Sequence, residues 1–171
     1  MAQRPFIFGL AGFSGSGKTT LAEKLISTAT QKGVRIATIK HAHHRFEADI
    51  EGKDSWRHRK AGAQQTLIAS AHRSALFTEN IIEKRPELSE LLARLDECDW
   101  VLVEGFKFEA IPKIEIYDEA LGHRPLYRQD NNITALISDN QIADCHLPIF
   151  KRDDVDGIFA HLLNLSKRGN S

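Results

Sequence analysis

The spacing of hydrophobic positions changes twice within the first forty residues. Residues 6–11 form a short apolar run that is typical of a buried parallel strand, and a glycine-rich segment follows it. Over residues 18–32 the apolar positions recur on one face of a helix, and Gly33 is a common stop signal at such an end. Residues 34–39 are strand-like again. This order predicts a βαβ unit, whose crossover connection is right-handed.

The rest of the chain alternates between strand-like and helical segments, which favours an α/β fold with helices on both faces of a mostly parallel sheet. The two strand-like runs around residues 66–78 could make that sheet mixed. We expect one domain over residues 1–171, with residues 168–171 as a flexible tail. The expected strands lie at 66–69, 74–78, 100–103, 114–117, 133–138 and 147–150, and the expected helices at 54–62, 87–95 and 155–165.

The segment between the first strand and the first helix, GFSGSGKTT at residues 12–20, matches the phosphate-binding pattern G-x-x-x-x-G-K-[ST] in full. Its glycines allow turns in which successive backbone N–H groups point at one anion, and the N-terminus of the following helix favours negative charge. Lys18 can reach the β- and γ-phosphates, and the Thr19 hydroxyl can ligate Mg²⁺. We therefore predict a P-loop nucleotide-binding domain of the P-loop NTPase fold. The predicted phosphate-binding residues are Gly12, Ser14, Gly15, Ser16, Gly17, Lys18, Thr19 and Thr20.

The apolar run at residues 100–103 carries an acid at each end, Asp99 and Glu104. Only the carboxyl end of a parallel strand faces the nucleotide crevice, so Glu104 is the better candidate for a Mg²⁺-ordering acid. The alternative is a solvated glutamate at a strand end. Gly105 would let the backbone pass close to the phosphates, and Lys107 could face the same crevice or the solvent. Lys18 and Glu104 are the predicted catalytic residues, and Thr19 and Glu104 the predicted metal ligands.

A basic, histidine-rich segment follows the second strand, with Lys40, His41, His43 and His44 within five positions. Imidazole is a common zinc ligand, but no CxxC or HExxH pattern accompanies these residues. Contact with phosphates or an anionic substrate is the favoured interpretation, because Lys40 adds a positive charge. Dedicated metal binding is the alternative.

A second polar cluster, Asp49, Lys53, Asp54 and Ser55, lies at a predicted junction between a loop and a helix. Asp54 or Ser55 could act only as the helix N-cap. A role for Asp49, Lys53 and Asp54 in ligand binding requires support beyond this pattern.

The composition is that of an ordinary globular protein, with 42% hydrophobic and 27% charged residues. Lys and Arg number 23, as do Asp and Glu, so no basic excess points to nucleic acid or to an anionic membrane. A net charge near zero permits self-association. No secretory signal or membrane-spanning run is visible, and the two cysteines form no disulfide framework, so we expect a cytoplasmic protein.

Five motifs in order resemble the MobB family of GTP-binding adaptor proteins in molybdopterin-guanine dinucleotide biosynthesis. They are GFSGSGKTT, IKHAHH, DIEGKDSWRHRKAGA, DWVLVEGFKFEAIPKIEIY and GHRP, and the resemblance extends over about residues 5–163. One departure is Glu51-Gly52, where the family often has Pro-Gly before Lys-Asp-Ser, which could alter the stiffness of that loop.

The resemblance implies a homodimer that binds GTP and Mg²⁺, has weak GTPase activity and assists a nucleotidyltransferase partner of the MobA type. It assigns phosphate and Mg²⁺ binding to the glycine-rich loop, and it matches Glu104 to the acidic residue of the family's VEGFK motif. It also matches the family's D-x-x-G-K-D-S and KHxHH signatures. The residues matched there are Asp49, Lys53, Asp54, His41, His43 and His44.

The base that this nucleotide site accepts is the least defined feature, because the guanine-reading pattern [NT]-K-x-D is absent. Asp139 follows a late strand, and we expect it either to accept hydrogen bonds from the guanine N1 and N2 groups or to be a simple turn residue. Two other functions remain open: a small-molecule or nucleotide kinase on a P-loop fold, and a GTP-dependent metal-insertion chaperone. The kinase lacks a recognisable arginine-rich lid, and the chaperone depends on the histidines alone.

Overall fold

The computed structural model describes residues 4–42, 46–82 and 85–168, which form two compact units. The first, here called the sheet unit, comprises Met1–His41 and Leu88–Ser171, and the second, the hairpin unit, comprises Ala42–Glu87, each over its described residues. Within the described residues no helix is both long and apolar enough to span a bilayer.

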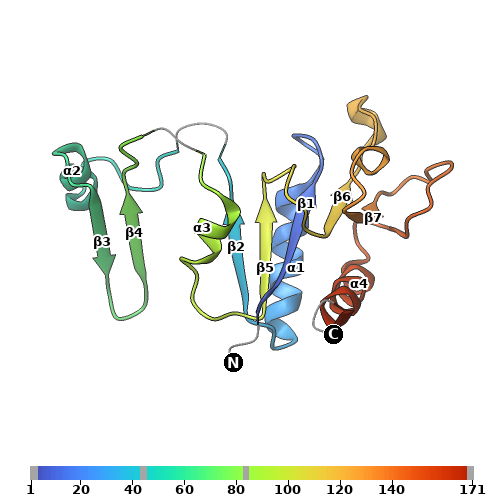
Figure 1. The fold of residues 1–171 in the computed structure, drawn as a ribbon, viewed down its shortest axis with the longest axis horizontal. Coiled ribbons are helices and arrows are strands. Elements are labelled where there is room, and N and C mark those ends of the chain that lie inside the picture. The colour runs from blue at the N-terminus through green and yellow to red at the C-terminus, as the bar shows by residue number, and fades with distance from the viewer. Residues whose placement is uncertain (1–3, 43–45, 83–84, 169–171) are drawn as a thin grey trace. The chain divides into compact units, whose positions relative to one another are not determined.

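The sheet unit is built on six strands in the order β2-β5-β1-β6-β7-β8, and every neighbouring pair is parallel (Figure 1). Strand β1 lies in the middle, pairing with β5 from Phe6 opposite Trp100 to Leu10 opposite Glu104. The carboxyl ends of β1 and β5 therefore meet at one edge of the sheet. The strands are β1 (Phe6–Ala11), β2 (Ile36–Lys40), β5 (Trp100–Glu104), β6 (Lys113–Ile116), β7 (Ile133–Ile137) and β8 (Ile149–Phe150).

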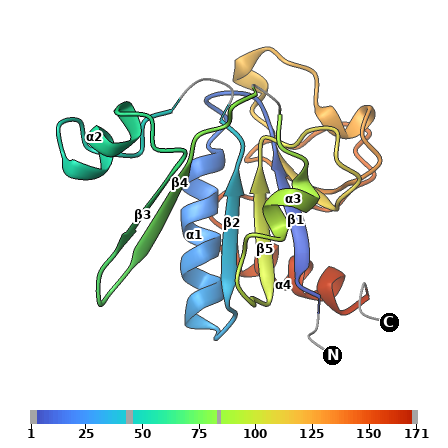
Figure 2. The same ribbon diagram turned by 60° about the vertical axis from the view of Figure 1, so that its left-hand side comes forward.

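Helices cover both faces of this sheet, as the sequence predicted (Figures 1 and 2). Helices α1 (Lys18–Gln31) and α4 (Val155–Arg168) pack on one face against a core that includes Phe8, Trp100 and Ile137. Helix α4 extends to Arg168, the first residue of the expected tail. The short helix α3 (Leu88–Leu92) packs on the other face.

Two smaller apolar clusters lie away from the α1–α4 core. One joins α3 to Val101, Val103 and Phe106, and the other joins Tyr117, Tyr127 and Leu136 near the 3₁₀ helix η2 (Leu126–Arg128). A second 3₁₀ helix, η1 (Glu119–Leu121), precedes it.

The hairpin unit contains helix α2 (Asp54–Lys60) and the antiparallel strands β3 (Gln65–Ala69) and β4 (Ser74–Thr78). These strands form a two-stranded sheet of their own, so the expectation that they could make the main sheet mixed is wrong. Leu67 lies opposite Leu76 in the ladder, and both side chains are mostly exposed.

Candidate functional site

The glycine-rich loop connects the carboxyl end of β1 to the first turn of α1, as the motif predicts. Gly17 precedes the helix in a left-handed conformation with φ of 95° and offers no side-chain cap to its N–H groups. Gly12 has φ of 140°, and a Cβ atom there would come within 2.6 Å of the Ile116 carbonyl oxygen and 2.7 Å of Ser16 Oγ. Only glycine therefore fits this position.

Two polar side chains of the loop have the placement that an anion requires. The Lys18 ammonium lies across the loop, where it donates to the carbonyl oxygens of Gly12 at 2.9 Å and Phe13 at 2.7 Å. Ser16 Oγ is buried and has no hydrogen-bond partner among the described residues. Because a buried hydroxyl is normally satisfied, a phosphate oxygen at this point would complete the site, and the loop fits a nucleotide's phosphates.

Ser14, Gly15, Thr19 and Thr20 are solvent-exposed in the loop and in the first turn of α1.

Four charged side chains lie close together at the carboxyl edge of the sheet beside this loop: Lys18, Lys40, Glu104 and Lys107. Lys40 Nζ lies 3.5 Å from Glu104 Oε2, and the Glu104 side chain is only 12% exposed. Burial lowers the pKa of Lys18; the Glu104 charge acts in the opposite direction, and the charges of Lys107 and Lys40 lower it further. The structure thus brings together four of the residues predicted to serve the nucleotide site, and three of them are cationic.

Gly105 packs closely against the segment that follows β2. Its φ is 89°, and a Cβ atom would come within 2.8 Å of the His41 carbonyl oxygen. The His41 N–H donates to the Glu104 carbonyl oxygen at 2.9 Å, and its ring packs against Phe106 with centroids 5.4 Å apart. Gly105 therefore allows close approach of the segment after β2, which fixes the backbone around Glu104.

Arg152, which the sequence did not single out, connects three segments of the sheet unit. Its Nη1 donates to the Ser16 carbonyl oxygen at 2.8 Å, and its Nη2 lies 3.1 Å from Asp118 Oδ2. Its backbone N–H and its Nε contact the two carboxylate oxygens of Asp139, at 3.1 and 3.2 Å. The guanidinium ties the phosphate loop to the ends of β6 and β7, and Asp139, the predicted guanine reader, is held by this arginine.

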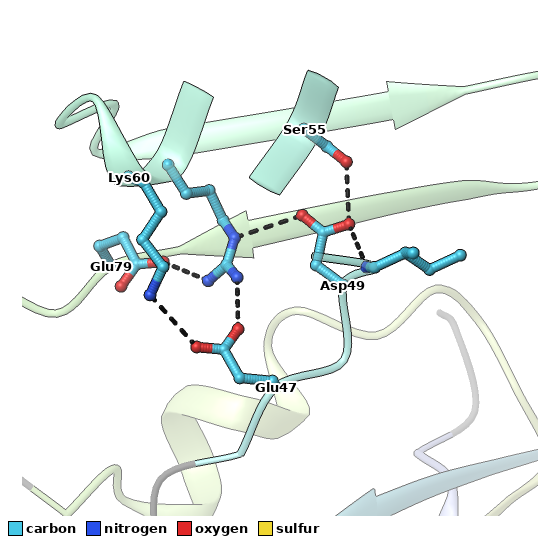
Figure 3. Close-up of polar contacts among 7 residues, drawn as sticks. Glu47, Asp49, Ser55, Lys60 and Glu79 are labelled. Carbon is cyan, nitrogen blue, oxygen red and sulfur yellow. Dashed lines mark hydrogen bonds and ion pairs between the residues drawn. The ribbon is translucent and has the colours of Figure 1, made fainter. Parts of the chain in front are cut away.

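Asp49, in the hairpin unit, is an internal structural group (Figure 3). Its carboxylate accepts hydrogen bonds from the Ser55 hydroxyl and the Ile50 N–H, both at 2.9 Å, and its side chain is only 6% exposed. These bonds fix the loop that enters α2. The N-cap of α2 is Lys53, which has no side-chain cap, so the expectation that Asp54 or Ser55 caps the helix is wrong.

The second residue that sequence reasoning missed is Arg59, which joins the acids of the hairpin unit. It lies 2.7 Å from Glu47, 2.7 Å from Glu79 and 3.4 Å from Asp49, and its guanidinium stacks over Phe77 at 5.2 Å. The hydrogen bond from Arg59, with the nearby Lys60 charge, lowers the pKa of Glu47. Only the pattern of basic residues along α2 hinted at this role.

The predicted residues His43 and His44 lie outside the described residues. Among the residues that the structure describes, no three His, Cys, Asp or Glu side chains are grouped so as to hold a metal ion. Lys53 and Asp54 are exposed at the start of α2 in the hairpin unit.

The site combines a central parallel strand, a loop in which Gly12 leaves no room for a side chain, and the Lys18 side chain lying across that loop. These features define the P-loop NTPase-like class of fold. Residues 7–139 match the family described as MobB, Molybdopterin guanine dinucleotide synthesis protein B, and the chain belongs to this family.

Known proteins agree with this assignment over nearly the whole chain. The molybdopterin-guanine dinucleotide biosynthesis adapter protein of Escherichia coli (strain K12) is 39% identical over 96% of this chain and 95% of its own length. The protein of the same name from Haemophilus influenzae is 43% identical over 76% of this chain and 72% of its own length. A crystal structure of molybdopterin-guanine biosynthesis protein B superimposes with a TM-score of 0.73 at 28% identity, covering 94% of this chain and 99% of that one.

Proposed function

We propose that this protein is a GTP-binding adapter in molybdenum cofactor maturation, acting in the cytoplasm. It binds GTP with Mg²⁺ and assists a MobA-type nucleotidyltransferase that forms molybdopterin-guanine dinucleotide. The observation that carries the proposal is the phosphate loop, in which the buried Ser16 hydroxyl lacks a partner and the Lys18 ammonium lies across the loop backbone. Membership of the MobB family supplies the pathway.

The chain's own residues divide the work at this site. Backbone N–H groups of the loop and the Lys18 ammonium bind the triphosphate, and Ser16 Oγ donates to a phosphate oxygen. The Thr19 hydroxyl and the Glu104 carboxylate would hold Mg²⁺, which when bound neutralises phosphate charge. Lys40 and Lys107 add positive charge at the same edge, which favours an anionic ligand.

Hydrolysis at this site is slow in our proposal. Rapid P-loop GTPases use an arginine finger or a glutamine that orients the attacking water. The described arginine nearest the loop, Arg152, donates to the Ser16 carbonyl oxygen and contacts two acids, so it is committed to the scaffold. Binding and presentation of GTP, more than its hydrolysis, fit an adapter.

Guanine selection by Asp139 remains part of the proposal. This carboxylate lies at the end of β7 and is exposed on one side, while Arg152 fixes its orientation. A fixed carboxylate is suited to accept two N–H groups from guanine. Asp139→Asn should reduce the preference for GTP over ATP, and an unchanged preference would refute this role.

A homodimer is proposed on the basis of the hairpin unit. Leu67 and Leu76 are 67% and 58% exposed on one side of β3 and β4, and Ile81 and Ile82 expose their side chains nearby in the sequence. Several exposed apolar side chains within one short segment are typical of a protein–protein interface.

The adapter role is tested by measuring guanine dinucleotide formation by a purified MobA-type enzyme at limiting GTP, with and without this protein. The wild-type protein should raise the rate, and Lys18→Ala should not, because it removes the phosphate-binding ammonium. Lys24→Ala is the matched control, since Lys24 is an exposed lysine on the same helix. Equal stimulation by all three proteins would contradict a role for nucleotide binding.

A further inference from the structure

A pocket of about 310 Å³ lies in the sheet unit, on the face that carries α3 and between the two smaller apolar clusters. Its volume is at the lower end of the roughly 300–1,000 Å³ that small-molecule sites occupy. The pocket shares Lys107 with the nucleotide site described above. Val103, Phe106 and Leu126 form apolar walls, and Lys113, Gln129, Asp130 and Asn132 supply polar groups.

The polar groups of this pocket are organised around a buried lysine. Gly9 carries no side chain, and a Cβ atom there would come within 3.0 Å of Lys113 Cγ, so the lysine stem lies against the bare backbone of β1. The buried Lys113 ammonium donates to the Glu109 carbonyl oxygen and to Asp130 Oδ2, the latter at 3.0 Å. Asp130 Oδ1 accepts from the Asn132 amide at 2.9 Å.

This chemistry suits a planar nitrogen heterocycle with an amide-like edge. Such a ring presents both hydrogen-bond donors and acceptors along one edge. The pocket offers matching groups: the Lys113 ammonium, the Asp130 carboxylate and the side-chain amides of Gln129 and Asn132. Its faces are apolar enough to pack against Phe106 and Leu126. The charged pair is already satisfied within the protein, so binding does not require a new buried charge.

The pocket also borders the phosphate loop. Ala11, which lines it, directly precedes Gly12, and Lys107 lines it while its ammonium lies 6.0 Å from the centroid of the Phe13 ring. An anionic group on the ligand would meet Lys107 at this end. Phe108 lines the pocket with its side chain 90% exposed, and a bound ring would cover part of it.

We propose that this pocket binds a pterin ring whose anionic substituent points to Lys107. The inference rests on the proposed function and deepens it, because it places the pterin half of the dinucleotide beside the guanine nucleotide. The adapter then holds both substrates of its partner enzyme in neighbouring sites of the sheet unit.

The test measures binding of 6-carboxypterin, whose ring fluorescence reports on its surroundings, to the full chain. Gln129→Leu and Asn132→Ala should each weaken binding by about three- to tenfold, the effect of one lost neutral hydrogen bond. Asn131→Ala is the matched control, since this neighbouring asparagine is exposed and does not line the pocket. Circular dichroism of each variant verifies the fold.

GTP binding is measured on the same samples, so that this inference and the proposed function are judged separately. Lys18→Ala should lose GTP and keep 6-carboxypterin. Absence of saturable pterin binding, displacement of the pterin by GTP, or equal weakening by Asn131→Ala would each overturn the pocket assignment. Pterin binding by the wild-type protein together with no GTP binding by that same protein would uphold the pocket and reject the GTP proposal.

Discussion

Different interactions stabilise the sheet unit and the hairpin unit. In the sheet unit, strands and helices enclose large buried side chains such as Phe8, Leu25 and Ile137. In the hairpin unit Thr66 is the buried residue among those described, and Leu67, Leu76 and other large apolar side chains are exposed. Ion pairs around Arg59 take the place of a hydrophobic core there.

The contrast indicates how the protein divides its tasks. A phosphate loop needs a rigid support, and burial of apolar area provides it in the sheet unit. A small hairpin with few buried side chains is marginal alone and gains stability when another surface covers it. The hairpin unit therefore suits association, and the sheet unit suits ligand binding.

The largest expected effect is a phenylalanine truncation compared between the units. Phe8→Ala should lower the free energy of unfolding by about 3–5 kcal/mol, because it leaves a cavity in the core. Phe46→Ala, the same change at an exposed position of the hairpin unit, should cost less than about 0.5 kcal/mol. Urea unfolding measures both, with Trp100 reporting on the sheet unit in a Trp56→Phe background and Trp56 reporting on the hairpin unit in a Trp100→Phe background. Similar costs would contradict the comparison.

Association should be the next most sensitive property. Leu67→Ser with Leu76→Ser removes the exposed apolar pair and should convert the proposed dimer to monomer in sedimentation equilibrium. Ile149→Ser, an exposed residue of the sheet unit, is the control and should leave the assembly intact. A dimer that persists in the double variant would place the interface elsewhere.

Arg59→Met should loosen the hairpin unit alone. The change removes the guanidinium that pairs with Glu47, Asp49 and Glu79. Residues 46–79 should therefore exchange amide hydrogens faster, while β1 and β5 keep their protection. Arg57→Met is the control, because Arg57 is exposed on the same helix. Faster exchange in the sheet unit as well would show that the two units are energetically coupled.

The smallest effect is a pH dependence within the sheet unit. Burial, with a contribution from the Arg168 charge, lowers the pKa of His161, whose ring lies 3.1 Å from Thr134 Oγ1. The unfolded chain then binds a proton more readily than the folded one, so stability is complete above pH about 6.5 and falls as the pH drops below that value. His161→Gln should flatten this slope in denaturation series, and exposed His58→Gln should not. An unchanged slope would assign the dependence to other groups.

Local signals in the sequence were sufficient to locate most of the fold. The apolar run of β1 and the strand around Val101 are fully or largely buried, so their hydrophobicity is continuous and their bounds are nearly those expected. The phosphate loop is likewise a local motif. The helix expected at 87–95 is shorter, Leu88–Leu92, because the N–H groups of Arg94 and Leu95 bond three residues back, although Leu95 still packs on the α3 side of the sheet.

The features that the sequence could not predict depend on contacts between distant residues. Arg152 reaches Ser16, 136 positions away, and nothing near Arg152 in the sequence marks it as different from other arginines. Glu115 is another case: its buried carboxylate accepts the N–H groups of Leu126 and Tyr127 and so fixes η2, and burial raises its pKa. An acid within an apolar strand gives no sign of its partners until the chain has folded.

Equilibrium binding of GTP and of ATP by titration calorimetry, each with and without Mg²⁺, tests the central claim most directly. The account predicts that GTP binds more tightly than ATP, that Mg²⁺ strengthens GTP binding, and that Glu104→Gln removes most of this strengthening. Tighter binding of ATP, or GTP binding that is indifferent to both Mg²⁺ and Lys18→Ala, would contradict it.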